Sequence, residues 1–264
     1  MNHDPFAWGR PLNETYGEYN YNIANASSVT SHRNPKMATQ QPIVTGSSVL
    51  AIKFKDGVIM AADNLASYGS LARFDNVERL LQVGKDTIVG CSGDISDFQK
   101  IERLLDDLEI EDGYDIENYE LKANHIHEYL SRVFYNRRSK MDPLWNSCLV
   151  GGFDADSGEP FLKYVDLLGV TYGADSLATG FGSHLAIPLL RKKLDSDDAV
   201  KNLTEEEGIK LISECMKVLY YRDARSLDKY SLAIIKKDDV KLIKGLRCED
   251  MSWRFASGIR GYGN

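Results

Sequence analysis

The chain has 264 residues, of which 43% are hydrophobic and 27% are charged, so it is long enough to bury a large core. Its net charge of -7 argues against a nucleic-acid or anionic-membrane partner, because both need a basic face. The sequence has no apolar run of about 18 residues that would predict a membrane span, and it does not start with a secretory signal. We therefore expect a cytoplasmic and nuclear protein with no membrane or nucleic-acid partner.

The first 38 residues contain few aliphatic side chains and have prolines at positions 5, 11 and 35, which predicts an extended or disordered segment. From Ile43 to Phe54 the chain is rich in β-branched and apolar residues, as strands are. A turn at 55–57 and a second apolar strand at 58–63 complete a hairpin pattern. Two further short strands are expected at 80–83 and 87–91.

The segment Ser92-Gly93-Asp94 predicts the start of a helix, in which apolar residues recur at helical spacing as far as Leu108. A second helix is expected from about Leu121 to Arg138. The remaining expected elements are strands at 147–153 and 160–166, helices at 180–194 and 205–221 with a cap at 202–204, and a last hairpin at 230–235 and 240–243.

The order of these elements is strands, two helices, strands, two helices, strands. Blocks of strands followed by pairs of helices favour antiparallel sheets with helices segregated on their outer faces. We therefore predict an α+β fold in which two antiparallel sheets, each covered by a helix pair, form a four-layer αββα sandwich.

The cysteines and histidines give no sign of a metal site. With neither a CxxC pair nor a histidine cluster nearby, the cysteines are typical of free thiols in a reducing compartment. His125 and His127 fall in a predicted helix, where residues two apart do not share a face. We expect no metal and no cofactor. The four cysteines are Cys91, Cys148, Cys215 and Cys248.

Four short motifs occur in the chain, each once, at characteristic separations from one another. Gly46-Ser47-Ser48-Val49 enters a strand that is followed by Asp63, and Ser92-Gly93-Asp94 sits at a strand-to-helix junction. Farther on come the segments 180–183 (Gly-Phe-Gly-Ser) and 221–226 (Tyr-Arg-Asp-Ala-Arg-Ser). In this order and spacing they resemble proteasome beta subunits, from about residue 39 to about residue 243. The resemblance implies the αββα fold of N-terminal-nucleophile hydrolases.

In active members of that family, autocleavage after a glycine exposes a threonine whose own α-amine is the base. A lysine held by an aspartate supplies positive charge, and a glycine N–H forms the oxyanion hole. Carried over by motif, Ser47 takes the place of the nucleophile after Gly46. Asp63 and Gly93 take the places of the lysine-holding aspartate and the oxyanion-hole glycine. The residues expected to orient the amine are Ser183, Asp223 and Ser226.

The lysine position falls on Arg79. A guanidinium stays charged at any accessible pH and cannot relay a proton, so we expect a structural, bidentate ion pair between Arg79 and Asp63. Leu227 also departs from the glycine that follows the last serine in active members. Each position has an ordinary alternative: Ser47 as a strand serine, Asp63 as a turn cap, Gly93 as a helix-start glycine.

Within the family, the segments 39–46, 137–145, 167–172 and 219–226 resemble the non-catalytic seventh beta class of fungal proteasomes. That resemblance implies removal of a pro-segment, residues 1–38, by a cut between Ala38 and Thr39. It also implies a beta-type domain at 39–246 and a C-terminal arm at 247–264. After such a cut Ser47 would keep its peptide bond to Gly46 and have no free amine.

The C-terminal arm carries Trp253 and Phe255 in a glycine-rich stretch, a composition that favours docking on a partner over packing on its own domain. The resemblance implies that the arm reaches the opposite beta ring. The implied partners are the other alpha and beta subunits in stacked seven-membered rings, together with assembly chaperones.

Three functions remain open at this point. The first is a non-catalytic structural subunit of the 20S core particle, which serves ubiquitin-dependent proteolysis without being an enzyme. The alternative is an active N-terminal-nucleophile peptidase that uses Ser47. The third is an alpha-type ring subunit, which is disfavoured because residues 1–38 lack a helical apolar period.

Overall fold

The computed structural model describes residues 41–114, 120–250, 252 and 254. The described residues, which begin at Gln41, belong to one compact unit. The predicted pro-segment, the cut between Ala38 and Thr39, and the docking residues Trp253 and Phe255 lie outside the described residues and stay predictions.

One sheet has five strands, and all its neighbouring strands run antiparallel. The expected hairpin is present: Val49 pairs with Ala62 and Phe54 pairs with Gly57 across the turn. In spatial order the strands are β11 (Ser176–Ala178), β2 (Val49–Phe54), β3 (Gly57–Asp63), β12 (Lys229–Lys236) and β13 (Asp239–Arg247).

The second sheet has eight strands. Its N-terminal strand lies between two strands that come later in the chain. Seven strands follow one path, and β6 (Leu80–Val83) pairs with β7 beside that path. The path runs through β10 (Thr171–Gly173), β9 (Pro160–Asp166), β8 (Asn146–Phe153), β7 (Thr87–Asp94), β1 (Val44–Gly46), β4 (Ala66–Tyr68) and β5 (Leu71–Phe74).

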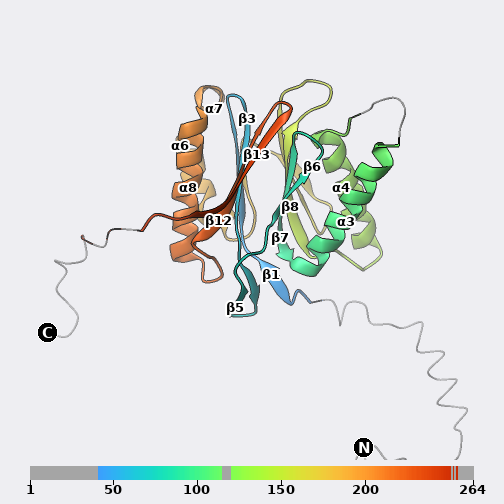
Figure 1. Ribbon diagram of the computed structural model, residues 1–264, viewed down its shortest axis with the longest axis horizontal. Coiled ribbons are helices and arrows are strands. Elements are labelled where there is room, and N and C mark those ends of the chain that lie inside the picture. Colours follow the sequence, from blue (N-terminus) through green and yellow to red (C-terminus); the bar gives the residue numbers. More distant parts are fainter. Residues whose placement is uncertain (1–40, 115–119, 251, 253, 255–264) are drawn as a thin grey trace, which may run out of the picture. The chain divides into compact units, whose positions relative to one another are not determined.

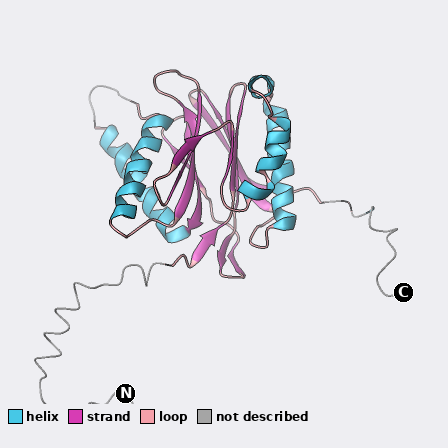
Figure 2. Cartoon of the chain, turned by 180° about the vertical axis from the view of Figure 1, so that it is seen from behind, coloured by secondary structure: helices cyan, strands magenta, loops and turns pink. Residues whose placement is uncertain are grey.

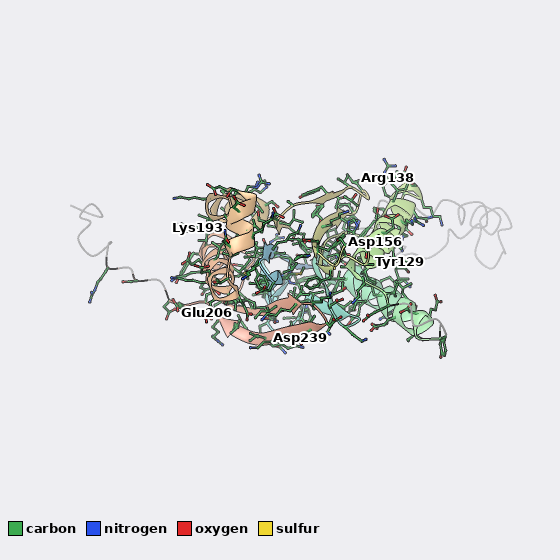
Figure 3. The ribbon with its side chains drawn as sticks, turned by 90° about the horizontal axis from the view of Figure 1, so that it is seen from above. Tyr129, Arg138, Asp156, Lys193, Glu206 and Asp239 are labelled. Atoms are coloured by element: carbon green, nitrogen blue, oxygen red, sulfur yellow. The ribbon has the colours of Figure 1, made fainter. Side chains whose placement is uncertain are left out.

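Helices cover the outer face of each sheet (Figures 1 and 2). The eight-stranded sheet carries α3 (Ile95–Asp112) and α4 (Ala123–Ser139). The five-stranded sheet carries α5 (Gly182–Leu185), α6 (Ile187–Lys193), α7 (Asp197–Asn202) and α8 (Glu205–Arg222). Seen from above, Lys193 and Glu206 lie on one outer helix layer, and Tyr129 and Arg138 lie on the other (Figure 3).

Three apolar clusters hold the four layers together. One lies between α8 and the five-stranded sheet, and a second lies between α3, α4 and the other sheet. The third lies between the two sheets and includes Val49, Met60 and Leu149, each fully buried. The predicted four-layer αββα sandwich is therefore confirmed. No helix among the described residues is long and apolar enough to cross a membrane.

Several element boundaries differ from those predicted. The strand expected at 43–54 is broken at Ser47-Ser48, so that β1 and β2 belong to different sheets. Strand β7 continues through Gly93, and Asp94 caps α3 by accepting a hydrogen bond from the Asp97 N–H at 3.0 Å. The helix expected at 180–194 is two helices, and Pro188 sits in the first turn of the second, where its missing N–H costs nothing.

Candidate functional site

Ser47 lies where the chain passes from β1 in one sheet to β2 in the other. Its side-chain oxygen donates a hydrogen bond to the carboxylate of Asp223, which caps the C-terminus of α8. The other oxygen of that carboxylate accepts the backbone N–H of Arg225 at 2.9 Å. The structure thus joins two predicted site residues that are 176 positions apart.

Arg79, just before β6, is 1% exposed and is the largest fully buried side chain among the described residues. Its guanidinium makes five hydrogen bonds, to the backbone oxygens of Asp63, Ser47, Ser48 and Cys91 at 2.8–3.0 Å and to the carboxylate of Asp63. A guanidinium has five N–H groups, so every donor is used. Because these acceptors come from both sheets, Arg79 links the sheets at the point where β1 meets β2.

The ion pair between Arg79 and Asp63 is confirmed as a contact, but the expected bidentate geometry is wrong. Only one carboxylate oxygen of Asp63 meets the guanidinium, and Nε bonds the backbone carbonyl of the same residue at 3.0 Å. The second carboxylate oxygen accepts the backbone N–H of Leu227 at 3.0 Å. Arg79 therefore divides its donors among backbone carbonyls as well as the carboxylate.

Burial raises the pKa of Asp63 above its usual value, while the Arg79 guanidinium and the Leu227 N–H act in the opposite direction. An isolated charge at this depth would be costly, so the pair and its backbone bonds form one unit. Removing either partner would leave the other without its counter-charge in a nearly dry site.

Gly93 lies in β7 and is the Cα partner of Gly46 in β1. Its φ of 100° and its surroundings both require glycine, because an added Cβ would lie 2.1 Å from the Trp145 carbonyl oxygen. Gly93, the predicted oxyanion-hole glycine, therefore lies close to Ser47. At this position, however, β7 is paired with β1.

The hydroxyls of Ser183 and Ser226 form hydrogen bonds with backbone carbonyls and not with Ser47. The Ser183 hydroxyl donates to the Gly180 carbonyl at 2.8 Å, and the Ser226 hydroxyl donates to the Asp223 carbonyl at 2.8 Å. Within the described part of the chain, neither hydroxyl is hydrogen-bonded to Ser47. Of the amine-orienting set, the structure joins only Asp223 directly to Ser47.

Besides Cys91, whose carbonyl accepts from Arg79, Ser48 and Leu227 contribute to the site without having been predicted as site residues. The Ser48 hydroxyl accepts the backbone N–H of Gly182 at 2.8 Å, and its carbonyl accepts from Arg79. Leu227 contributes only its backbone N–H, to Asp63. The repeated serine at 47–48 could have drawn attention to Ser48, whereas a backbone donor leaves no signal in the residue type.

Comparison with known proteins identifies the family of the chain. The model of the family described as proteasome subunit matches residues 43–235, which covers well over half of the chain. The chain belongs to the proteasome subunit family.

The relatives are beta-type subunits. The chain is 54% identical to proteasome subunit beta type-7 of Saccharomyces cerevisiae over 100% of this chain and 98% of that protein. It is 50% identical to the probable proteasome subunit beta type-7 of Schizosaccharomyces pombe over 97% and 95%. Proteasome subunit beta type-4 of Xenopus laevis is 47% identical over 86% and 92%. The predicted beta-type proteasome subunit, resembling type 7, is therefore confirmed.

Proposed function

We propose that this chain is a non-catalytic, structural beta subunit of the proteasome core particle. It would build the beta ring with other alpha and beta subunits and help two half-particles to join. Its membership in the family and the beta type-7 names of its yeast relatives support this role. We also propose that the chain works in the cytoplasm and the nucleus, and that assembly chaperones help it during ring formation.

One observation carries the non-catalytic part: all five N–H donors of Arg79 are engaged inside the fold. A guanidinium cannot accept a proton from an attacking hydroxyl, because it does not deprotonate in proteins. It also has no donor left to bind a reacting group. The basic group that the chemistry needs is replaced here by a structural link.

The hydrogen bond between Ser47 and Asp223 is the observation that favours the alternative, an active Ser47 peptidase. A serine nucleophile in this fold needs a free α-amine as its base. Under the proposed maturation between Ala38 and Thr39, Ser47 would remain within a peptide and lack that amine. Ser47 would then have a structural role, anchoring the end of β1 to the end of α8.

An epoxyketone peptide tests whether Ser47 is a nucleophile or a structural residue. The probe forms a stable ring only with an N-terminal residue that offers both an amine and a hydroxyl. Purified particles are treated with the probe, and each chain is weighed by mass spectrometry. We expect adducts on the active subunits and none on Ser47. An adduct on Ser47 would contradict the non-catalytic role.

The assembly part of the proposal rests on the arm, 247–264. Deleting it should leave the αββα domain folded and slow the joining of half-particles, because the aromatic residues Trp253 and Phe255 would no longer dock on the opposite ring. Native gels after a pulse of expression would show half-particles accumulating. Normal amounts of full particle would contradict this role for the arm.

A further inference from the structure

Cys91 in β7 and Cys148 in β8 face each other across two neighbouring strands. They are Cα partners in the register of the eight-stranded sheet, and their sulfur atoms lie 2.8 Å apart. Both thiols are free and buried, with exposed fractions of 2% and 0%. The two residues are 57 positions apart in the sequence, so it is the fold that brings them together.

The backbone places this pair at one of the narrow positions of the antiparallel ladder. The N–H of Cys91 donates to the Arg79 carbonyl at 3.1 Å, and the Cys91 carbonyl accepts from the Arg79 guanidinium at 3.0 Å. Both backbone groups therefore point away from β8, which makes Cys91 and Cys148 a non-hydrogen-bonded pair. The Cα atoms of such a pair lie about 4.5 Å apart. That spacing falls within the range of roughly 4.4–6.8 Å that a disulfide spans.

The surroundings offer each thiol the other as its reaction partner. Both side chains belong to the apolar cluster between α3, α4 and the eight-stranded sheet. Burial, and then the contact with Cys91, raise the pKa of the Cys148 thiol well above its usual value. In the described part of the chain, no group of three or more histidine, cysteine, aspartate or glutamate side chains is placed to hold a metal ion.

We infer that Cys91 and Cys148 are a reversible modification site, at which a peroxide converts the two thiols into a disulfide that joins β7 to β8. Cys91 is the thiol that the peroxide oxidises, because Cys148 is fully buried and holds its proton tightly. Cys148 is then the resolving thiol. The site does not depend on whether Ser47 is a nucleophile, since it lies in the core and uses other residues.

The reaction has two steps. In the first, the Cys91 sulfur attacks one peroxide oxygen, the O–O bond breaks, and the released hydroxide takes the thiol proton to become water. In the second, the Cys148 sulfur attacks the sulfenic sulfur of Cys91, the S–O bond breaks, and the hydroxyl leaves with the Cys148 proton as a second water. The two electrons lost by the sulfurs reduce the peroxide. A dithiol reductant reverses the change and is itself oxidised to a disulfide.

The neighbouring thiol decides what oxidation does to this part of the core. A sulfenic acid that has no thiol beside it is oxidised further to a sulfinic acid, which dithiols do not reduce. A sulfinate is charged at neutral pH, and a charge in this apolar cluster would be costly. Capture by Cys148 therefore keeps the oxidation of Cys91 neutral and recoverable.

Peroxide treatment of purified particles tests the inference on the unchanged chain. Hydrogen peroxide is raised at pH 8 until one of the four cysteines begins to be lost, and the particles are then denatured in N-ethylmaleimide. We expect Cys91 and Cys148 to be lost first and together, so that labelling falls from four thiols to two. A digest without reductant should contain the two joined peptides, and dithiothreitol before labelling should restore all four thiols.

Two variants separate the role of the partner from the effect of burial. In Cys148→Ala particles, the loss of Cys91 should no longer be reversed by dithiothreitol, and sulfinic acid should appear at Cys91. Cys215→Ala is the matched control, because Cys215 is also fully buried but belongs to the cluster under α8. It should form the linked peptide as the unchanged chain does.

Several results would overturn the inference. They are an earlier loss of Cys215 or Cys248, a loss of Cys91 without Cys148, and a loss in the unchanged chain that dithiothreitol does not reverse. Equal recovery of Cys91 in Cys148→Ala and in the unchanged chain would also overturn it. If Cys148→Ala particles do not assemble, the order of loss and the linked peptide in the unchanged chain decide the question alone.

Discussion

The guanidinium of Arg79 donates a hydrogen bond to the backbone carbonyl of Ser47 at 2.8 Å. Arg79, which the motifs predict at the position of the catalytic lysine, is therefore bonded to the main chain of Ser47, which they predict at the position of the nucleophile. This contact holds the junction of β1 and β2 in place, and it accounts for the burial of a large charged side chain.

Replacing Arg79 should destabilise the fold. Arg79→Met leaves the Asp63 carboxylate buried without its partner, which should cost about 3–5 kcal/mol of unfolding free energy. Arg79→Lys keeps the charge but offers three donors to the five acceptors, so it should cost about 1–3 kcal/mol. Urea unfolding of the purified chain measures both changes.

Arg132→Met is the matched control, because Arg132 pairs with Glu128 on the surface of α4 and is 79% exposed. It should change the unfolding free energy by no more than about 0.5 kcal/mol. An Arg79→Met chain as stable as the Arg132→Met chain would show that the buried link is not needed.

Gly93→Ala should be severely destabilising. The residue has a φ of 100°, and its new Cβ would lie 2.1 Å from the Trp145 carbonyl oxygen. We expect a loss of at least about 3 kcal/mol, seen as failure to enter particles or as a lower urea midpoint. Gly113→Ala, with ordinary φ and room for a methyl group, should change the stability by less than about 1 kcal/mol.

Stability should depend on pH through His127, which packs on Phe161 and whose Nε2 lies 3.1 Å from the Tyr164 carbonyl oxygen. Burial lowers the pKa of His127 below its usual value of 6.5. Between the lowered value and 6.5, the unfolded chain binds a proton that the folded chain does not, so stability falls as the pH falls through 6.5. Above 6.5 this contribution is fully present.

Comparing His127→Gln with the unchanged chain at pH 5.5 and 7.5 isolates this effect, because glutamine does not titrate. The stability difference between the two pH values should be smaller in the variant. Identical pH profiles for the two chains would rule out His127 as the group responsible.

The thiols of Cys215 and Cys248 should react slowly with alkylating agents. Burial raises the pKa of Cys248 to about 11 and that of Cys215 to about 12. At pH 8 only about one Cys248 thiol in a thousand is then ionised, against about a quarter of ordinary thiols. Labelling by iodoacetamide should accelerate about tenfold per pH unit up to about pH 11. Labelling of native Cys248 at pH 8 as fast as that of glutathione would contradict this.

Much of the fold follows from the sequence, since buried apolar faces impose clear periods. Strand β9 has the predicted bounds, and α8 begins at the predicted cap, where Thr204 and Glu207 satisfy each other's backbone donors. Strands β4 and β5 were not predicted. β5 is exposed at every position, so no burial pattern marks it.

The break between β1 and β2 could not be read from local sequence. The residues on both sides are strand formers, and the sheets part there because Arg79, more than 30 positions away, binds the carbonyls of Ser47 and Ser48. The motifs did predict that Ser47, Asp63, Arg79 and Asp223 would meet. They could not predict that the hydroxyls of Ser183 and Ser226 would donate to nearby backbone carbonyls instead of facing Ser47. Which nearby carbonyl a hydroxyl reaches depends on the local backbone geometry.

The most direct test of the account is the intact mass of this chain from purified particles. A mature chain that begins at Thr39 keeps Ser47 within a peptide, with its amine unavailable, and this is the predicted result. A chain that begins at Ser47 would mean that autocleavage proceeds despite Arg79. That result would contradict the non-catalytic role.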